Sequence, residues 1–187
     1  MERILEFARK FWLPLLIVAV VAVVAMVWLF RIKLAAIPEE DQQDFRPGGT
    51  LGDPNLPRGM RNNNPGNLVL TMIPWRGKVP NYANTDGKFE QFTDYHWGIR
   101  AMLLDLRSDI NKGKNTIRKL IYEYAPPFEN NTASYINNLA SATGIGSDEV
   151  ITFNQSTMRP IAKQIARIEN GRDAITDSQF NYAWSLI

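Results

Sequence analysis

The chain contains no cysteine and only one histidine, His96. The absence of cysteine excludes disulfides, a cysteine nucleophile and thiolate zinc sites. No second histidine and no carboxylate cluster at ligand spacing accompanies His96, so the sequence predicts no metal site. No serine lies in surroundings typical of a Ser-His-Asp triad. A glycine-rich phosphate-binding loop is also missing, and no cofactor is expected.

A large excess of charge is missing as well. The chain has 21 Lys and Arg against 19 Asp and Glu, a net charge of +2 at pH 7. Nothing in this balance indicates a nucleic-acid partner. With 187 residues, 45% hydrophobic and 21% charged, the composition is typical of a globular protein with one domain and appendages.

One uncharged apolar stretch, FWLPLLIVAVVAVVAMVWLF, occupies residues 11–30. A helix of this length can cross a hydrocarbon core of about 30 Å. Trp12 and Trp28 lie near its ends, where indole rings favour the membrane interface. The alternatives are a cleaved signal peptide and a buried core helix, but the stretch is longer than a usual signal-peptide core and no small-x-small site follows Phe30. The sequence therefore predicts a single transmembrane helix and contact with a lipid membrane.

The remaining chain divides by composition. Residues 1–10 form an N-terminal flank, and their Lys and Arg outnumber those just after residue 30 by three to two, which favours a C-terminal part outside the membrane. Residues 31–57 are polar and include several Pro and Gly, which predicts a flexible linker. Residues 58–187 are expected to form the folded domain.

Apolar residues with a 3.6-residue period predict a mainly α domain after an irregular first third. Five helices are expected, beginning near Thr93, Thr116, Thr132, Ser156 and Asp177. In the first of them Ile99, Leu103, Leu106 and Ile110 share one face. Gly113, Pro126, Gly144 and Gly171 mark the ends of the first four.

Four asparagines crowd the stretch RGMRNNNPGNL, residues 58–68. Asparagine is favoured in turns because its side chain bonds the local backbone and tolerates left-handed conformations. The alternative is functional, because an amide offers both a donor and an acceptor to sugar hydroxyl and N-acetyl groups. On that interpretation Asn64 and Asn67 bind substrate.

Glu169, in the stretch IARIENG, is the candidate catalytic acid. It adjoins the apolar face of a predicted helix and precedes the helix-breaking pair Asn170-Gly171. Partial burial and the negative end of a helix both raise the pKa of a carboxyl, which can then act as a general acid. The alternative is an ordinary solvated glutamate. Glu129 is a rival acid, with less reason for a raised pKa because it lies in a predicted loop.

The stretch YAPPFENNTASYI, residues 124–136, supplies a possible second wall. Tyr124, Asn130 and Asn131 are further substrate-binding candidates on this interpretation. The alternative is a plain connection between two helices with Thr132 as the N-cap.

Several of these stretches occur together in a known order. RGMRNNNPGNL, W-x-G at Trp75, GIRAM at residues 98–102 and YAPPFENNTASYI resemble a group of phage virion and prophage proteins linked to peptidoglycan cleavage. The resemblance covers residues 58–187. It implies peptidoglycan as a partner, together with a role in a virion.

A second resemblance is to glucosaminidases and lytic transglycosylases of the lysozyme superfamily. Their asparagine-rich loop is similar to Asn63–Gly66, and their paired helices are similar to the stretch from Tyr124 to Tyr135. In those enzymes the helix that ends in the catalytic Glu precedes the loop, whereas IARIENG follows it here. We therefore expect a lysozyme-like domain, with circular permutation as one form of it.

The resemblances together predict a membrane-anchored enzyme that opens the cell wall locally. Asp173 and Asp177 are candidates for a partner carboxylate by their position in the sequence. The expected location is either the internal membrane of a virion or a bacterial inner membrane. The competing prediction is a non-catalytic virion protein that binds peptidoglycan, capsid or other virion proteins.

Overall fold

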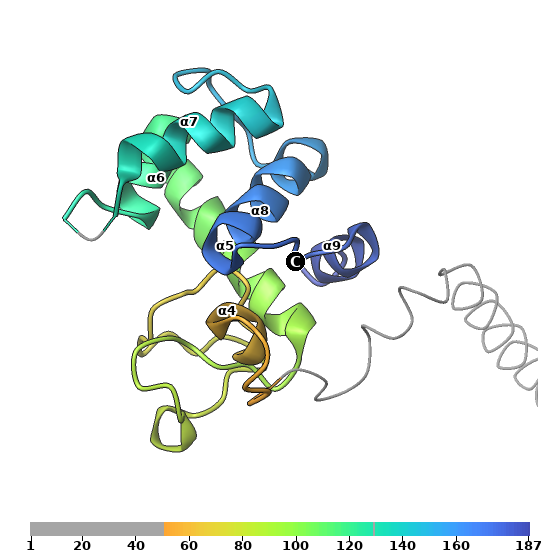
Figure 1. Ribbon diagram of the computed structural model, residues 1–187. Helices are drawn as coiled ribbons and strands as arrows, with labels where there is room; N and C mark the ends of the chain where they lie inside the picture. Colours follow the sequence, from red (N-terminus) through yellow and green to blue (C-terminus); the bar gives the residue numbers. More distant parts are fainter. Residues whose placement is uncertain (1–50, 129) are drawn as a thin grey trace, which may run out of the picture. The chain divides into compact units, whose positions relative to one another are not determined.

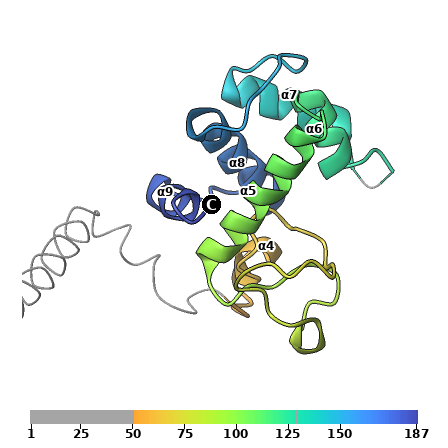
Figure 2. The ribbon, with the colours of Figure 1, turned by 180° about the vertical axis from the view of Figure 1, so that it is seen from behind.

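The computed structural model describes residues 51–128 and 130–187. These residues form a mainly helical domain with α4 to α9 and one short 3-10 turn, Asn81–Ala83. The α-helices are α4 (Arg58–Arg61), α5 (Tyr95–Asn111), α6 (Ile117–Tyr124), α7 (Thr132–Thr143), α8 (Gln155–Asn170) and α9 (Asp177–Trp184). In Figure 1, α6, α7 and α8 lie on one side and the loop segment 62–94 on the other. Helix α5 runs between them, and the view from behind in Figure 2 shows the same arrangement.

The five predicted helices, α5 to α9, are all present, and their capping residues explain where they begin. The Thr116 hydroxyl accepts a hydrogen bond from the Lys119 N–H at the start of α6. Thr176 and Gln179 form a reciprocal capping box at the start of α9. Asn131 caps α7, which begins at Thr132 as predicted. Two helices begin a residue or two away from the predicted position: α5 begins at Tyr95, after Asp94, and α8 begins at Gln155, capped by Asn154.

The core lies where the apolar faces of these helices meet around α5. Ile99, Leu103 and Leu106 are completely buried, as are Ile161 and Ile165 of α8. Helix α5 packs against α9, and α7 packs against both α6 and α8. The predicted 3.6-residue period is therefore the period of the core-facing positions.

Residues 62–94 contain no regular strand, only isolated antiparallel bridges such as Val69 with Phe89 and Lys78 with Phe92. Side chains hold this loop segment together. Glu90 is completely buried, and its Oε1 accepts hydrogen bonds from Lys78 Nζ at 2.8 Å and from the Thr71 N–H at 3.0 Å. A buried charge of this kind is tolerated because it is paired and hydrogen-bonded.

The structure corrects the predicted fold class. None of the helices in the described part of the chain is long and apolar enough to cross a membrane. The longest, α5, has 17 residues and carries polar side chains along its exposed face, whereas a span needs about 20 apolar residues. The predicted transmembrane helix at residues 11–30 lies outside the described residues. The fold class that the structure supports is a mainly helical domain, and the predicted single-pass location in a virion or inner membrane is withdrawn with the span.

A close approach between α5 and the asparagine loop provides a test of the packing. A Cβ added to Gly98 would lie 1.8 Å from the Asn63 carbonyl oxygen. We expect Gly98→Ala to lower the free energy of unfolding by about 3 kcal/mol, the upper range for overpacking. Gly144→Ala, in a left-handed cap with open space around it, should cost only about 1 kcal/mol. Urea unfolding of both variants measures the difference, and equal stabilities would contradict the described contact.

Candidate functional site

The asparagine loop begins the site, and most of its amides are structural. Asn62, Asn63 and Asn64 are buried. The Asn64 side chain donates to the Leu68 and Glu90 carbonyl oxygens at 2.9 and 3.0 Å, and its Oδ1 accepts from the Leu68 N–H. Asn63 and Asn67 have positive φ angles of 52° and 49°, as the turn interpretation predicts. Asn64 is completely buried, so the structure leaves its side chain no surface for a substrate.

Asn67 is the amide of this loop that faces the candidate acid. Its Nδ2 donates to Glu169 Oε2 at 2.9 Å. Tyr135, on α7, donates from its hydroxyl to the other carboxyl oxygen, Oε1, at 3.1 Å. Glu169 itself occupies the last turn of α8 and is half-buried.

Burial raises the pKa of Glu169 above its ordinary value, while the hydrogen bonds from Asn67 and Tyr135 oppose the rise only in part. The position at the C-terminus of α8 acts in the same direction as burial. Glu169 therefore keeps its proton to a higher pH than an exposed glutamate, which is the property that a general acid needs.

Asn170, the neighbour of the acid, attaches the end of α8 to the asparagine loop. Its Nδ2 donates to the Pro65 and Ala166 carbonyl oxygens, each at 2.8 Å, and its Oδ1 accepts from the Met60 N–H at 3.1 Å. The bonds to Pro65 and Met60 attach the end of α8 beside Asn67, so Glu169 contacts Asn67 although the two residues are 102 positions apart in the sequence.

Two tyrosine hydroxyls flank the acid. Tyr124, at the end of α6, donates to the Gly66 carbonyl oxygen. Burial, followed by the nearby Glu169, raises the pKa of both Tyr124 and Tyr135 well above the ordinary value. Both hydroxyls therefore remain protonated and available as hydrogen-bond donors.

The acid opens into a pocket of about 400 Å³ between the loop segment and the helices. Its lining comprises Gly66, Asn67, Val69, Lys88, Phe89, Tyr124, Ala125, Asn130 and Glu169. Four of the six predicted site residues, Asn67, Tyr124, Asn130 and Glu169, thus share one pocket. Asn131 does not line it; its Oδ1 instead accepts from the Ser134 N–H as the cap of α7. A larger hollow of about 580 Å³ between α7 and α8 carries no carboxyl group on its walls.

A second pocket, of about 290 Å³, adjoins the first and shares Asn67, Val69 and Tyr124 with it. Its other walls include Trp75 and the carboxyl group of Asp105. Burial and the neighbouring Asp109 raise the pKa of Asp105 to about 6. We call the two adjoining pockets together the groove; Phe89 lines its first pocket and Trp75 its second.

The other predicted carboxylates lie elsewhere. Asp173 pairs with Arg167 at 2.9 Å and Asp177 with Lys163 at 2.8 Å, both on the surface, and neither lines the groove. Glu129 lies outside the described residues. Among those that are described, no group of three His, Asp or Glu side chains could hold a metal ion.

Sequence reasoning missed Tyr135, Asn170, Phe89 and Lys88. Asn170 and Tyr135 had visible signals, because each stands in a stretch already singled out for another residue. Phe89 begins an F-x-x-F motif shared with the phage proteins that the chain resembles, whereas Lys88 carries no signal of its own, since the fold of the loop segment alone brings it to the pocket.

No protein-family model matches the chain. Protein P5 of Pseudoalteromonas phage PM2 is 33% identical to it over 123 residues, which are 64% of this chain and 74% of that protein. The chain belongs to the family of Protein P5. A link to phage is therefore established, whereas the name of Protein P5 states neither an enzymatic activity nor a membrane location.

The raised pKa of Asp105 predicts a pH-dependent stability. Its pKa is 3.8 when exposed and about 6 in the fold, so ionisation opposes folding and stability falls as the pH rises from about 4 to about 6. Asp105→Asn should remove this dependence and stabilise the domain at pH 7 by about 1–2 kcal/mol, after allowance for solvent screening. Thermal unfolding between pH 4 and pH 8 measures both effects. An unchanged slope in the variant would show that Asp105 is not the group responsible.

Removing the Asn67 amide should raise the pKa of Glu169 further, because its hydrogen bond favours the ionised form. We expect Asn67→Ala to shift the carboxyl titration of Glu169 upward, measured by ¹³C NMR. Asn131→Ala, which removes an amide without contact to Glu169, is the matched control and should leave the titration in place. A downward shift in Asn67→Ala would mean that the amide does not stabilise the carboxylate.

Proposed function

We propose that this member of the Protein P5 family is a phage virion protein that cleaves the glycan strands of peptidoglycan. The observation that carries the proposal is a half-buried carboxyl group with a raised pKa, Glu169, in a groove walled by amides, hydroxyls and aromatic rings. Sugar polymers match such a groove because their hydroxyl and N-acetyl groups need donors and acceptors while their ring faces pack on aromatic side chains.

In the proposed reaction Glu169 acts first as a general acid. Its proton passes to the glycosidic oxygen, the bond between that oxygen and the anomeric carbon breaks, and an oxocarbenium-like state develops. The leaving sugar departs with a new hydroxyl, and Glu169 is left as a carboxylate.

The same carboxylate then acts as a base. It takes the proton of the sugar's own 6-hydroxyl while that oxygen bonds to the anomeric carbon, which gives an anhydro product and restores the protonated acid. This route suits the site because Glu169 is the one carboxyl group among the described residues of the first pocket. Hydrolysis would need a second carboxylate beside Glu169, and the other carboxyl groups of the groove, Asp105, Asp109 and Glu123, line the second pocket and not the first.

The neighbours of Glu169 have matching roles in this proposal. Asn67 and Tyr135 hold the carboxyl through one hydrogen bond to each oxygen, which fixes the direction of proton transfer. Asn130, on the opposite wall, offers an exposed amide to the sugar.

A second candidate is a non-catalytic virion protein that uses the same groove to bind peptidoglycan or a capsid partner. The first pocket has a single carboxyl group. Glycan cleavage with one acid also requires a well-placed substrate hydroxyl, so the same observation is compatible with a protein that binds glycan without cleaving it. The experiment below separates the two.

We expect Glu169→Gln in the full-length protein to reduce cleavage of peptidoglycan by about 10²–10⁴-fold, the usual contribution of a general acid. Asp173→Asn, which removes an exposed carboxylate of the same C-terminal region, should retain full activity. Clearing zones in a gel containing peptidoglycan, followed by analysis of the product ends, provide the measurement. Equal clearing by wild type and Glu169→Gln would remove the assignment of the acid. Binding without clearing by every protein would select the second candidate.

A further inference from the structure

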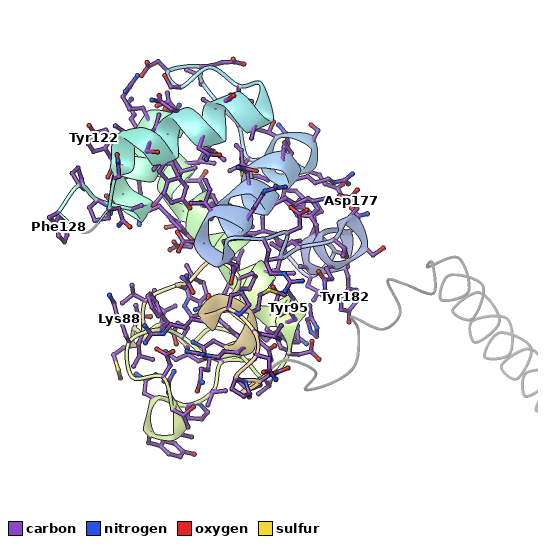
Figure 3. All side chains as sticks on the ribbon, viewed as in Figure 1. Lys88, Tyr95, Tyr122, Phe128, Asp177 and Tyr182 are labelled. Carbon is purple, nitrogen blue, oxygen red and sulfur yellow. The ribbon has the colours of Figure 1, made fainter. Side chains whose placement is uncertain are left out.

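The pocket around Glu169 contains one side chain whose role the proposed reaction leaves open. Lys88, in the loop segment, lines this pocket together with Tyr124 and Asn130. Figure 3 shows it at the edge of that segment, on the side nearer α6 and α7. An exposed lysine is common on any surface, so the argument depends on its surroundings.

The charges around Lys88 are not balanced. In the same loop segment Lys78 pairs with Glu90, and Arg58 pairs with Asp86 at 2.7 Å. Lys88 forms no such ion pair with any carboxylate in residues 51–128 and 130–187. Its charge is therefore available to a ligand in the pocket.

Phe89 and the backbone hold Lys88 in place at this edge. Its Nζ lies 5.3 Å from the centre of the Phe89 ring, within range of a cation–π contact. The Lys88 carbonyl oxygen accepts from the Leu70 N–H at 2.9 Å, and the Lys88 N–H donates to Asp86 Oδ1 at 3.2 Å. Arg58 also contacts this ring, with its Cζ 4.6 Å from the ring centre, but its charge is already paired with Asp86.

Lys88 is the one cationic side chain on the described lining of the first pocket, whereas the second pocket carries Asp105, Asp109, Lys112 and Glu123. Besides Lys88, the only ionisable carboxyl or ammonium group on the described lining is that of Glu169. A protonated Glu169 is neutral, which leaves the pocket with one positive charge in the state that begins the proposed reaction.

We propose that Lys88 is a specificity-determining residue that binds a carboxylate carried by the glycan. The inference rests on the proposed function and deepens it, because it defines the substrate as an acidic glycan in preference to a neutral one. Two sources present this chemistry in peptidoglycan: the free carboxylates of the stem peptide, and the lactyl group of any sugar from which the peptide has been removed. An exposed ion pair is worth about 0.2–1 kcal/mol, so its loss should weaken binding by up to about fivefold.

The test measures binding without cleavage, in the full-length protein with Glu169→Gln. Co-sedimentation with insoluble peptidoglycan gives the affinity, and peptidoglycan with its carboxyl groups converted to amides is the comparison. We expect Lys88→Gln to weaken binding to the native material about threefold to fivefold and to have no effect on the amidated material. Lys88→Arg should restore binding. Lys119→Gln, which removes the same charge from an exposed position on α6 away from the groove, is the matched control.

An amidase removes the peptides and frees a lactyl carboxylate on each muramyl sugar, and the resulting soluble strands carry no peptide carboxylate. In a titration with these strands, a Lys88 effect assigns the carboxylate to the sugar, and the absence of an effect assigns it to the peptide. Equal binding to native peptidoglycan by the Glu169→Gln protein with and without Lys88→Gln, or an equal loss on the amidated material, would overturn the inference while leaving glycan cleavage intact. If binding depends on Lys88 but the wild-type protein does not cleave peptidoglycan, the proposed enzymatic activity is wrong and the inference about Lys88 stands. If the protein binds no peptidoglycan, both proposals fall.

Discussion

The three hydrogen bonds of the Asn170 amide are the constraint on which the site depends. This buried side chain uses both its donor and its acceptor atoms to attach the last turn of α8 to the backbone at Met60 and Pro65. The fit is tight, because a Cβ on Gly59 would lie 2.6 Å from Asn170 Oδ1. Since buried polar groups are costly when unpaired, few other side chains could replace this amide. The hydrogen bonds of Asn170 therefore also fix the position of the adjacent Glu169.

Opposing effects meet at the carboxyl group that Asn170 positions. Burial favours the neutral form, and two donated hydrogen bonds favour the ionised form, with burial prevailing. The two donors differ in kind: the Asn67 Nδ2 can only donate, whereas the Tyr135 hydroxyl can also accept. The Oε1 edge beside Tyr135 therefore tolerates a proton better than the Oε2 edge. An acid with one such edge can exchange its proton without losing the contacts that hold it.

Much of the helical fold could be predicted from the sequence, because buried positions in α5 and α8 repeat at the helical period and strong caps such as Thr116 and Thr176 bound α6 and α9. The grouping of Tyr124 and Asn67 with the acid could also be anticipated from recurring motifs. The sequence could not show that the Asn64 side chain is buried while that of Asn67 faces the pocket. All these asparagines suit turns equally well, and only long-range packing decides which of them is buried. The loop segment has no hydrophobic periodicity, so the contacts of its side chains with the helices could not be predicted from the sequence.

The two walls of the groove come from opposite ends of the domain's sequence, the asparagine loop early and the turn that carries the acid late. Contacts between such distant segments form only when the whole domain closes, and they open with it. A chain still emerging from the ribosome, or one clipped before α8, would possess the amides without the acid. Ligand binding and any reaction in the groove therefore require the complete, folded domain.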